Sequence, residues 1–303
     1  MSIIKQIAHK DIDFNKWDKT ILSSEFPLVF AQSFYLNATA PKWDALVIGD
    51  YESVFPLTHK IKLGFKYLPQ PSFTSQLGVY GKVSDEIEAL FYGHITKKYK
   101  LIEIELNASN KFKTKDISPK NTYVIDYSKE YKYNQNTKRN IKKALDEGFC
   151  IKRVDTNESI ALSKKWIDPF LKNNLQLSKT AVKTFNVLLS SCKKDDHLLT
   201  LKAINKNGDI KALAHFVFNT KHALYLKGTN LDKKENSGSM HLLLDAAIKH
   251  FDGKVNFFDF GGGSMSESLA GFYLGLGGSP CYYSFLKINR LPQLVNKLKG
   301  IKN

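Results

Sequence analysis

Secondary-structure signals occur in the same order twice along the chain, and this repeat limits the folds that the sequence can adopt. In the first half, a strand over residues 3–8 precedes two helical segments, a meander of three strands, a helix and the strand LIEIELN. In the second half, the strand FCIKRVD precedes two helical segments, a second meander, a helix over 238–251 and the strand VNFFDF. Alternating apolar residues indicate the strands, and a period near 3.6 indicates the helices. Both halves therefore read β-α-α-β-β-β-α-β.

This order predicts an α+β protein with two tandem domains, each a mixed and mostly antiparallel sheet flanked by helices. We place the first domain at residues 1–128 and the second at 129–303, which are ordinary domain sizes. After the last repeat element, the sequence predicts a short helix, the strand CYYSFLKI and a C-terminal helix. The pair Gly49-Asp50 predicts a hairpin in the first half.

Composition narrows the class of protein. The net charge is +16, most of it after residue 125, and it favours either an anionic ligand or a lysine-rich solvated surface. No apolar run approaches the roughly 20 residues of a membrane span, and no secretory signal begins the sequence. We therefore expect a basic cytoplasmic protein without stable membrane insertion. Three scattered cysteines and eight histidines without ligand spacing indicate no metal site.

Two glycine clusters flank a short helical segment in NFFDFGGGSMSESLAGFYLGLGGSP, residues 256–280. The first cluster is not a dinucleotide fingerprint, because Ser266 stands where the third glycine belongs, and no Gly-Lys-Ser/Thr follows. One interpretation is a tight turn with a residue at positive φ. The other is a bare backbone at which two substrates meet. The candidate substrate-binding residues of this turn are Gly261, Gly262, Gly263 and Ser264.

A second candidate site lies where a helix begins, at Ser237, Gly238 and Ser239. Free backbone N–H groups and the positive end of the helix dipole form an anion site there, and glycine lets a diphosphate approach. Lys233 and Lys234 add positive charge in the preceding loop. An ordinary N-cap is the alternative, since Ser and Gly begin many helices that bind nothing.

Several segments resemble the Fem-type transferases, and the element order is similar to the GNAT acyltransferase fold. NTKRNIKKALDEGF, residues 136–149, resembles the stretch that opens the second domain of Fem-type amino-acid and acyl transferases. FFDFGGGSMSESLAGFYLGLGGSPCYYSFLKI resembles their closing signature. WDALV, VFPL and QLGVYG look like the N-terminal half of FemAB-like acyltransferases from Bacteroidetes-type genomes.

The resemblance implies a tandem GNAT pair whose second domain carries the acyl donor and whose groove takes an amine acceptor. Known members use acyl-CoA or aminoacyl-tRNA as the donor. The strand edge that would pair with the pantetheine amides of acyl-CoA comprises Leu226, Lys227, Gly228 and Thr229. One departure weakens the tRNA-dependent cell-wall reaction: Tyr273 follows Phe272, where the peptidoglycan-active enzymes have a lysine.

Four residues are candidates for proton transfer: Tyr273, Tyr283, Asp259 and Glu267. Tyrosine could donate a proton to the leaving thiolate, and strand alternation puts Tyr282 and Tyr283 on opposite faces. Asp259 could act as a base or could instead fix the glycine turn through hydrogen bonds. Glu267 could equally be a surface residue of its helix. His241, Asp245 and Lys249 recur at helical spacing and predict a solvated stack.

The resemblance to GNAT and Fem-type enzymes implies transfer of an acyl group from acyl-CoA to an amine by direct attack, without a metal. Lys138 and Arg139 would contact an anionic acceptor, such as an amine linked to a nucleotide or a lipid. One alternative is an aminoacyl-tRNA-dependent transferase acting on a cell-wall or lipid precursor. A second is a non-catalytic nucleic-acid-binding protein using Tyr131 and Tyr133 with the same two cations. A third is a degenerate GNAT pair that keeps the fold without chemistry.

Overall fold

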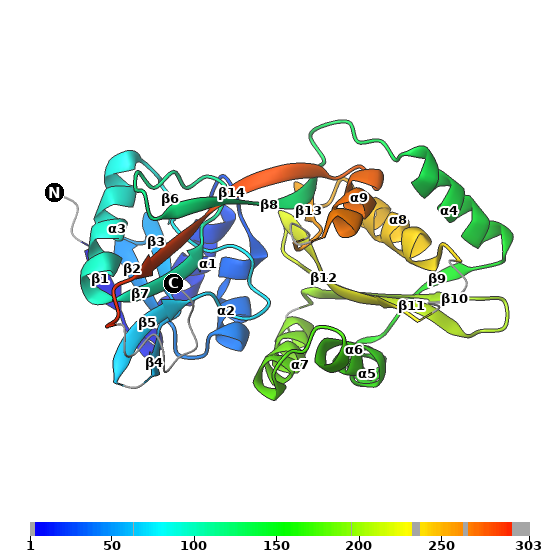
Figure 1. The fold of residues 1–303 in the computed structure, drawn as a ribbon, viewed down its shortest axis with the longest axis horizontal. Coiled ribbons are helices and arrows are strands. Elements are labelled where there is room, and N and C mark those ends of the chain that lie inside the picture. The colour runs from blue at the N-terminus through cyan, green and yellow to red at the C-terminus, as the bar shows by residue number, and fades with distance from the viewer. Residues whose placement is uncertain (1–3, 63, 195, 232–236, 263–265, 293–303) are drawn as a thin grey trace. The chain divides into compact units, whose positions relative to one another are not determined.

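The computed structural model describes residues 4–62, 64–194, 196–231, 237–262 and 266–292 (Figure 1). The chain divides into two compact units. Unit 1 comprises Met1–Lys120 and Tyr282–Asn303, and unit 2 comprises Asn121–Cys281. The predicted C-terminal helix and the residues Lys233, Lys234, Gly263 and Ser264 lie outside the described residues.

Unit 1 contains two groups of strands with helices around them. One group has the strand order β1-β2-β3-β6, and the other has the order β4-β5-β7-β14. Three helices, α1, α2 and α3, accompany them (Figure 1). The elements are β1 (Ile4–Ile7), η1 (His9–Asp11), α1 (Phe14–Leu22), η2 (Val29–Ala31), α2 (Ser33–Thr39), β2 (Asp44–Ile48), β3 (Ser53–Leu57), β4 (Lys60–Lys62), β5 (Phe65–Pro69), β6 (Tyr80–Gly81), α3 (Asp85–Lys98), β7 (Leu101–Glu105) and β14 (Ser279–Asn289).

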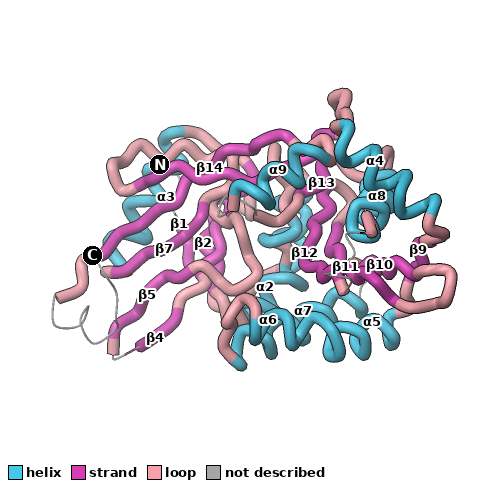
Figure 2. The backbone as a smooth tube through the Cα atoms, turned by 45° about the vertical axis from the view of Figure 1, so that its right-hand side comes forward, coloured by secondary structure: helices cyan, strands magenta, loops and turns pink. Residues whose placement is uncertain are grey.

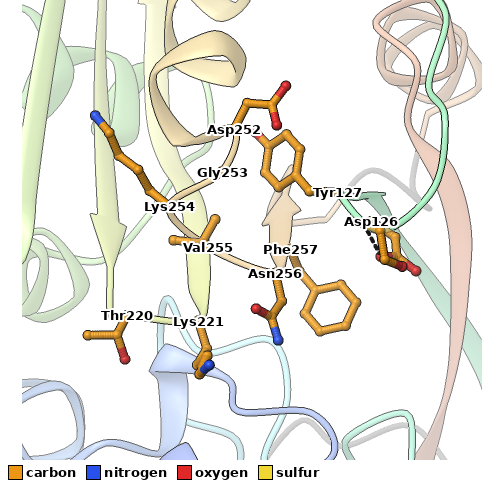
Figure 3. A pocket seen from close by; sticks show the side chains of 11 residues that line it. Asp126, Tyr127, Thr220, Lys221, Asp252, Gly253, Lys254, Val255, Asn256 and Phe257 are labelled. Carbon is orange, nitrogen blue, oxygen red and sulfur yellow. Dashed lines mark hydrogen bonds between the residues drawn. The ribbon is translucent and has the colours of Figure 1, made fainter.

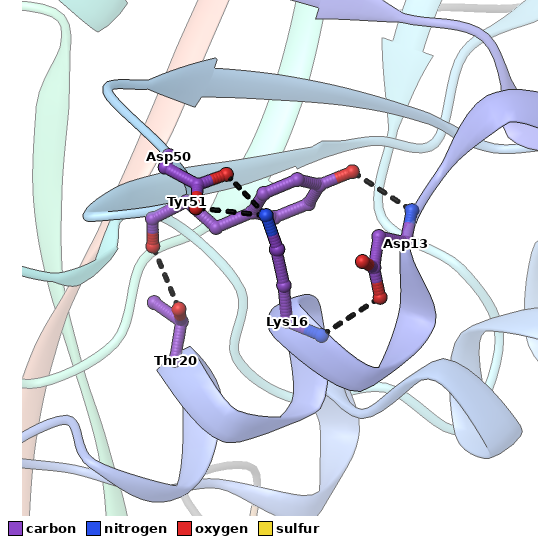
Figure 4. Close-up of polar contacts among 5 residues, drawn as sticks. All are labelled: Asp13, Lys16, Thr20, Asp50 and Tyr51. Atoms are coloured by element: carbon purple, nitrogen blue, oxygen red, sulfur yellow. Dashed lines mark hydrogen bonds and ion pairs between the residues drawn. The ribbon is translucent and has the colours of Figure 1, made fainter.

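The predicted hairpin at Gly49-Asp50 is present, and side chains tie its turn to α1 (Figure 4). The Lys16 ammonium lies 2.7 Å from the Asp50 carboxylate. The Tyr51 hydroxyl accepts a hydrogen bond from the backbone N–H of Asp13 at 2.8 Å, and the Thr20 hydroxyl donates to the Tyr51 carbonyl at 2.7 Å. Tyr51 has a φ of +64°. These bonds hold that uncommon backbone conformation in place.

Unit 2 is a single sheet with helices on both faces (Figure 1). The strand order is β8-β13-β12-β11-β10-β9, with β12 and β13 parallel and the other pairs antiparallel. Helices α5, α6 and α7 cover one face, whereas α4, α8 and α9 cover the other (Figure 1, Figure 2). The elements are β8 (Ile117–Asp126), α4 (Gln135–Asp146), β9 (Cys150–Arg153), α5 (Thr156–Leu162), the π-helix η3 (Ser163–Ile167), α6 (Asp168–Asn173), α7 (Lys179–Lys194), β10 (Leu198–Ile204), β11 (Ile210–Phe218), β12 (His222–Asn230), α8 (Ser239–Phe251), β13 (Phe257–Asp259) and α9 (Glu267–Gly275).

The apolar stripe of α8 makes the core of unit 2. Leu243, Leu244 and Ala247 are fully buried and pack on the sheet through Phe216 and Phe258. Burying each of these side chains contributes about 1–3 kcal/mol. Helix α8 is thereby held rigidly on the sheet, with its N-terminus at a fixed position beside β12.

Residues 282–303 cluster with unit 1, although the predicted division gave them to the second domain. The reason is strand pairing: β14 runs antiparallel to β7, from Phe285 opposite Glu105 to Asn289 opposite Leu101. The predicted boundary at residue 128 and the observed one after Lys120 also differ, because β8 begins before the predicted boundary and pairs with β13. Strand β8 itself was not predicted.

Candidate functional site

A cavity of about 530 Å³ lies at the start of α8. Three elements of unit 2 form its wall: the end of β12, the first turn of α8 and the first turns of α9. Its lining combines hydroxyl, amide and imidazole groups with apolar side chains, and no Lys, Arg, Asp or Glu is among the described residues that line it. The lining residues are Asn230, Gly238, Ser239, Met240, His241, Ser266, Ser268, Leu269 and Phe272.

The N-terminus of α8 has no side-chain cap. Gly238 occupies the N-cap position with a φ of +74°, and no acidic residue follows in the first turn. The backbone N–H groups of Ser239, Met240 and His241 have no acceptor among the residues that the structure describes. Unpaired N–H groups and the positive end of the dipole are favourable surroundings for an anion. The cavity borders this end.

The corresponding helix of unit 1 is closed to anions. Ser84 caps α3, because its hydroxyl accepts a hydrogen bond from the N–H of Ile87. Three carboxylates, those of Asp85, Glu86 and Glu88, occupy the first turn. The Glu88 carboxylate is buried and accepts a bond from the N–H of Lys111 at 2.9 Å. The dipole of α3 is thus already complemented by carboxylates, whereas that of α8 is not.

Two buried serine hydroxyls beside the α8 terminus lack hydrogen-bond partners. Ser237 and Ser239 are each 1% exposed, and the Oγ atom of each has no partner among the described residues. A buried hydroxyl without a partner costs about 1–3 kcal/mol. Ser239 also lines the cavity. A ligand that accepts hydrogen bonds would remove this cost, which fits a phosphate or diphosphate.

His241 is a lining residue that the sequence reasoning missed. Its ring lies edge-on to Phe272 with centroids 4.8 Å apart, and burial lowers the pKa of the imidazole. The prediction of a solvated His241-Asp245-Lys249 stack is wrong for Asp245, which is 5% exposed. His241 is half-buried, and Lys249 is exposed, with its ammonium 2.9 Å from Asp245. The spacing of residues along α8 could not indicate that Phe272, a residue of α9, packs against His241.

Strand β12 carries a β-bulge beside the cavity. His215 lies opposite Lys227 and Phe216 lies opposite Tyr225, so the intervening Leu226 has no partner on β11. The pairing of β12 with β13 ends at Leu224 opposite Asp259. Bulges re-aim side chains and often lie next to active sites. The bulge falls just where β12 parts from β13.

The four predicted pantetheine contacts lie on this stretch of β12. Thr229 is 5% exposed, and Gly228 lies against the hydroxyl of Tyr225. The Lys227 side chain points to the opposite face, where its ammonium lies 5.1 Å from the ring centroid of Phe170 in α6. Backbone groups rather than side chains therefore remain as the means by which this edge would contact a donor.

The glycine turn after β13 is held by Asp259. The Asp259 Oδ1 atom accepts hydrogen bonds from the Gly261 N–H and the Thr122 hydroxyl, both at 2.8 Å. Its Oδ2 atom lies 3.5 Å from Nε2 of His222. Asp259 is 1% exposed. The carboxylate is therefore placed to fix the turn, which is the second of the two roles considered for it.

Glycine at 261 is required by a close approach. It has a φ of +75°, and a Cβ atom there would lie 2.6 Å from the carbonyl oxygen of Tyr225 in β12. Gly262 also has a positive φ, +121°, and its N–H donates to the Thr122 hydroxyl at 3.3 Å. The turn thus packs directly on the bulged part of β12.

The remaining proton-transfer candidates occupy different surroundings. Tyr273 is 5% exposed and stacks on Phe260 at 4.6 Å, and burial raises the pKa of its hydroxyl, as do the nearby Tyr225 and Asp259. Tyr283 belongs to unit 1, where its hydroxyl donates to Glu105 at 3.1 Å. Glu267 is exposed at the start of α9.

The predicted alternation in β14 is confirmed by exposure. Tyr282 is 69% exposed, and the adjacent Tyr283 is 8% exposed.

The basic segment before and within α4 shows only part of the predicted arrangement. Lys138 and Arg139 are exposed. Tyr131 donates to Asp252 at 3.2 Å, and burial raises the pKa of Tyr133, which lies beside Asp245. Both tyrosine rings pack against the core of unit 2. They are therefore not displayed as a stacking surface for bases.

A larger cavity of about 580 Å³ lies at the other end of α8 (Figure 3). Lys221 and Lys254 line it together with the carboxylates of Asp126 and Asp252. An anion there would meet two carboxylates and the negative end of the α8 dipole. None of the predicted site residues lines it. The smaller cavity at the start of α8 is therefore the better anion site.

Over the described ranges, no helix is both long and apolar enough to cross a membrane. The same ranges contain no group of three or more His, Cys, Asp or Glu side chains that could hold a metal ion.

Comparison with known proteins gives relatives by structure alone. No protein-family model matches the sequence, and no curated protein matches it. FemX matches over 97% of this chain and 99% of its own, with a TM-score of 0.68 and 12% identity. A tandem GNAT protein from the clavulanic acid biosynthesis pathway matches over 96% and 100%, with a TM-score of 0.51 and 12% identity. A GNAT-family acetyltransferase from Colwellia psychrerythraea matches over 95% and 100%, with a TM-score of 0.52 and 10% identity.

At these identities the likeness concerns the fold, and it confirms the predicted fold class. Both halves of the chain are covered in each match. The chain has the two-domain α+β fold that FemX and tandem GNAT proteins share.

Proposed function

We propose that the protein is an N-acyltransferase that takes its acyl group from acyl-CoA and transfers it to an amine. The diphosphate of the donor binds at the first turn of α8. The pantetheine arm follows the free edge of β12 from Leu226 to Thr229, and the thioester lies beside the turn at Gly261 and Gly262. The name of one structural relative, an acetyltransferase, agrees with this class of donor.

The observation that carries the proposal is the difference between the two helix termini. Among the described residues, the first turn of α8 has no side-chain cap and no acid, and it borders a cavity, whereas the N-terminus of α3 is capped by Ser84 and surrounded by carboxylates. Within the described residues, this pattern supports one donor site, in unit 2. Three free N–H groups with the hydroxyls of Ser237 and Ser239 supply donors for a diphosphate.

The chemistry needs no covalent enzyme intermediate. The neutral amine attacks the thioester carbonyl, a C–N bond forms, and the C–S bond breaks. The amine loses one proton, and the departing thiolate gains one. We assign the proton donor to Tyr273 rather than Tyr283, because Tyr273 lies in unit 2 beside the glycine turn and its raised pKa keeps the hydroxyl protonated. The Tyr283 hydroxyl is bonded to Glu105 in unit 1.

The rival functions receive less support. Tyr273 still stands where the Fem-type enzymes that use aminoacyl-tRNA have a lysine, which argues against that donor. The nucleic-acid-binding interpretation needs exposed tyrosine rings, whereas Tyr131 and Tyr133 are half-buried and pack against the core of unit 2. A degenerate pair would have no need of an open helix terminus with unpartnered buried hydroxyls.

The test is calorimetric titration of the full chain with acetyl-CoA and longer CoA esters, compared with the variant Ser239→Asp. An aspartate in the first turn is favourable for the helix dipole but repels a diphosphate. We expect binding to the parent protein and at least a tenfold loss in Ser239→Asp. Because Ser239 is 1% exposed, the melting temperature of the variant is measured as well, and donor affinities are compared for folded protein. Asp85→Ser in α3 is the matched control and should leave donor affinity unchanged.

Two outcomes would contradict the proposal. One is that no CoA ester binds or stabilises the parent protein, since saturation at 100 times Kd should add about 2.7 kcal/mol. The other is transfer that occurs with aminoacyl-tRNA and not with any CoA ester, which would replace the donor.

A further inference from the structure

A row of polar side chains crosses the face of the unit 2 sheet that α5, η3 and α6 cover. Thr200 of β10 lies opposite His215 of β11, and His215 lies opposite Lys227 of β12. Facing residues on neighbouring strands are about 5 Å apart. The three side chains therefore form one line across three strands, on the face away from α8.

Hydrogen bonds connect the row at one end only. The hydroxyls of Ser159 in α5 and Thr200 lie 2.7 Å apart, and the Thr200 hydroxyl lies 2.8 Å from Nδ1 of His215. His215 is fully buried, and its Nε2 atom has no partner among the described residues. The chain of hydrogen bonds thus stops where the row continues to Lys227.

Lys227 is a half-buried cation without a counter-ion. Its ammonium lies over the ring of Phe170, and within the described part of the chain no carboxylate pairs with it. Burial lowers the pKa of this ammonium. A desolvated charge without a partner lowers stability, and an anionic ligand would offset that cost.

The helical layer that covers this face of the sheet contains two further unpartnered groups. Ser163 is fully buried, and neither its Oγ atom nor the Nε1 atom of Trp166 has a partner among the described residues. Trp166 precedes Phe170 by one helical turn and therefore lies on the side of Phe170 and Lys227. Ser163 and Trp166 both belong to the π-helix η3, which packs on β12. Single π-turns in helices frequently occur at functional sites.

We propose that Lys227, Trp166 and Ser163 bind the carboxylate of an amine acceptor. An ammonium and an indole N–H can only donate, and a hydroxyl can donate, so this set suits a ligand with acceptor atoms alone. One cation matches one carboxylate and leaves a phosphate dianion unbalanced. The acceptor class is therefore an amino acid or a similar amine that carries a carboxylate.

This inference rests on the proposed function for its chemistry, but the subsite itself does not depend on the donor. Lys227 directly follows Leu226, the bulged residue where β12 parts from β13. The donor edge and the carboxylate subsite would then use the same stretch of β12, with the subsite on the α6 face. An amine held through its carboxylate at Lys227 would lie near the point where the two strands separate.

The experiment measures binding without any donor. The chain has three tryptophans, and Trp166 is the one in unit 2, so the part of a fluorescence change that Trp166→Phe removes reports on the subsite. The full chain is titrated with an α-amino acid panel and with the carboxamide and the decarboxylated amine of each member. We expect at least one amino acid to bind about tenfold or more tightly than its carboxamide, as a charge-assisted hydrogen bond would give.

Variants locate the effect. The carboxylate preference is the affinity for an amino acid divided by the affinity for its carboxamide. Lys227→Met should bring this ratio close to one, and Lys227→Arg should restore much of it. Trp166→Phe, for which binding is followed by calorimetry, should reduce the ratio several-fold. Lys221→Met is the matched control, because this exposed lysine lies just before the same strand, and it should keep the full preference.

The inference is overturned if no carboxylate-bearing amine binds, or if Lys227→Met retains the preference. Failure of CoA esters to bind would count against the proposed donor and not against the subsite. Binding of carboxylates that depends on Lys227 in a chain that ignores CoA esters would support the subsite and contradict the donor.

Discussion

The carbonyl oxygen of Asn140 in α4 lies 2.1 Å from the point that a Cβ atom on Gly238 would occupy, at the start of α8. Helix α4 therefore packs on the N-terminus of α8 so closely that only glycine fits there. The same glycine lets α8 begin without a capping side chain, and this leaves the first N–H groups open to the cavity. The packing of α4 and the proposed anion site at α8 thus depend on one residue.

Gly238→Ala should lower the free energy of unfolding by about 2–5 kcal/mol. A positive φ costs a non-glycine residue about 1–2 kcal/mol, and overpacking adds about 1–3 kcal/mol. Urea denaturation measures the change. Gly253→Ala is the matched control, because Gly253 has a similar φ of +71° with nothing within 4 Å of its Cβ position. Its free energy of unfolding should fall only by the about 1–2 kcal/mol that the positive φ costs. Equal losses in the two variants would show that the Asn140 contact is not tight.

Local sequence patterns predicted most helices and strands, but they did not predict which distant strands pair with one another. Strands β10, β11 and β12 alternate clearly and were predicted, as was α8. Strand β8 was missed because Pro119 and its polar neighbours mask the alternation, and its partner β13 lies far along the chain. The strand β14 was expected, but its sequence carries no information on which edge it joins. Pairing with β7 is a tertiary choice.

The candidate site shows the same division. The start of α8 was predicted because Ser237, Gly238 and Ser239 form a local signal for a helix terminus. His241 was missed because its role depends on Phe272, which reaches it from another helix. Lys227 was named for its backbone, and nothing local indicated that its ammonium would lie unpaired beneath α6. Residue types mark a helix terminus, whereas a cavity wall is set by packing.

Asp259→Asn should destabilise the protein by about 1–3 kcal/mol, because hydrogen bonds to a buried carboxylate are charge-assisted and the amide accepts them less strongly. Thr122→Val should cost a similar amount, since the Thr122 hydroxyl bonds both the Asp259 carboxylate and the Gly262 N–H. The double variant should lose less than the sum, because the two side chains share one network. Urea denaturation of the four proteins forms the cycle. Additive losses would mean that the two residues act separately.

The three cysteine thiols should differ in their rate of reaction with a thiol reagent. Cys150 is exposed, Cys192 is buried, and burial together with the charge of Asp259 raises the pKa of Cys281 to about 11. The thiolate is the reactive form. One thiol, Cys150, should therefore react rapidly with Ellman's reagent at pH 8 in the native protein, and three should react in guanidinium. Rapid native labelling that survives Cys150→Ser would show that the glycine-turn region opens readily.

Tyr273→Phe and Tyr283→Phe should separate chemistry from stability. If Tyr273 protonates the leaving thiolate, Tyr273→Phe lowers kcat by about 100-fold, the low end for general acid catalysis, with the Kd of the CoA ester nearly unchanged. Tyr283→Phe loses the bond to Glu105 and should lower the free energy of unfolding by about 1 kcal/mol. Stopped assays and calorimetry measure the two quantities. A larger fall in kcat for Tyr283→Phe would transfer the role to that residue.

Acid should destabilise the protein through His215. Burial lowers the pKa of this imidazole to about 3, whereas the unfolded chain has a value near 6.5. Above pH 6.5 both states are neutral at this site, so its contribution to stability is complete. As the pH falls from about 6.5 toward 3, the unfolded state takes up a proton that the folded state refuses. The free energy of unfolding then falls by about 1.4 kcal/mol per pH unit from this residue.

His215→Asn should remove that slope, because asparagine can replace Nδ1 as the partner of Thr200 and does not titrate. Urea denaturation at pH 7, 6 and 5 should show a smaller loss of stability in the variant. Between pH 6 and 5 the difference in the free energy of unfolding should be about 1.4 kcal/mol, the value for uptake of one proton. His94→Asn is the control, because burial and two lysines lower the pKa of His94 at a partly exposed site, and it should change the slope much less. A parent protein whose stability is level from pH 7 to 5 would mean that His215 accepts a proton within the fold, with Nε2 gaining a partner that the neutral row lacks.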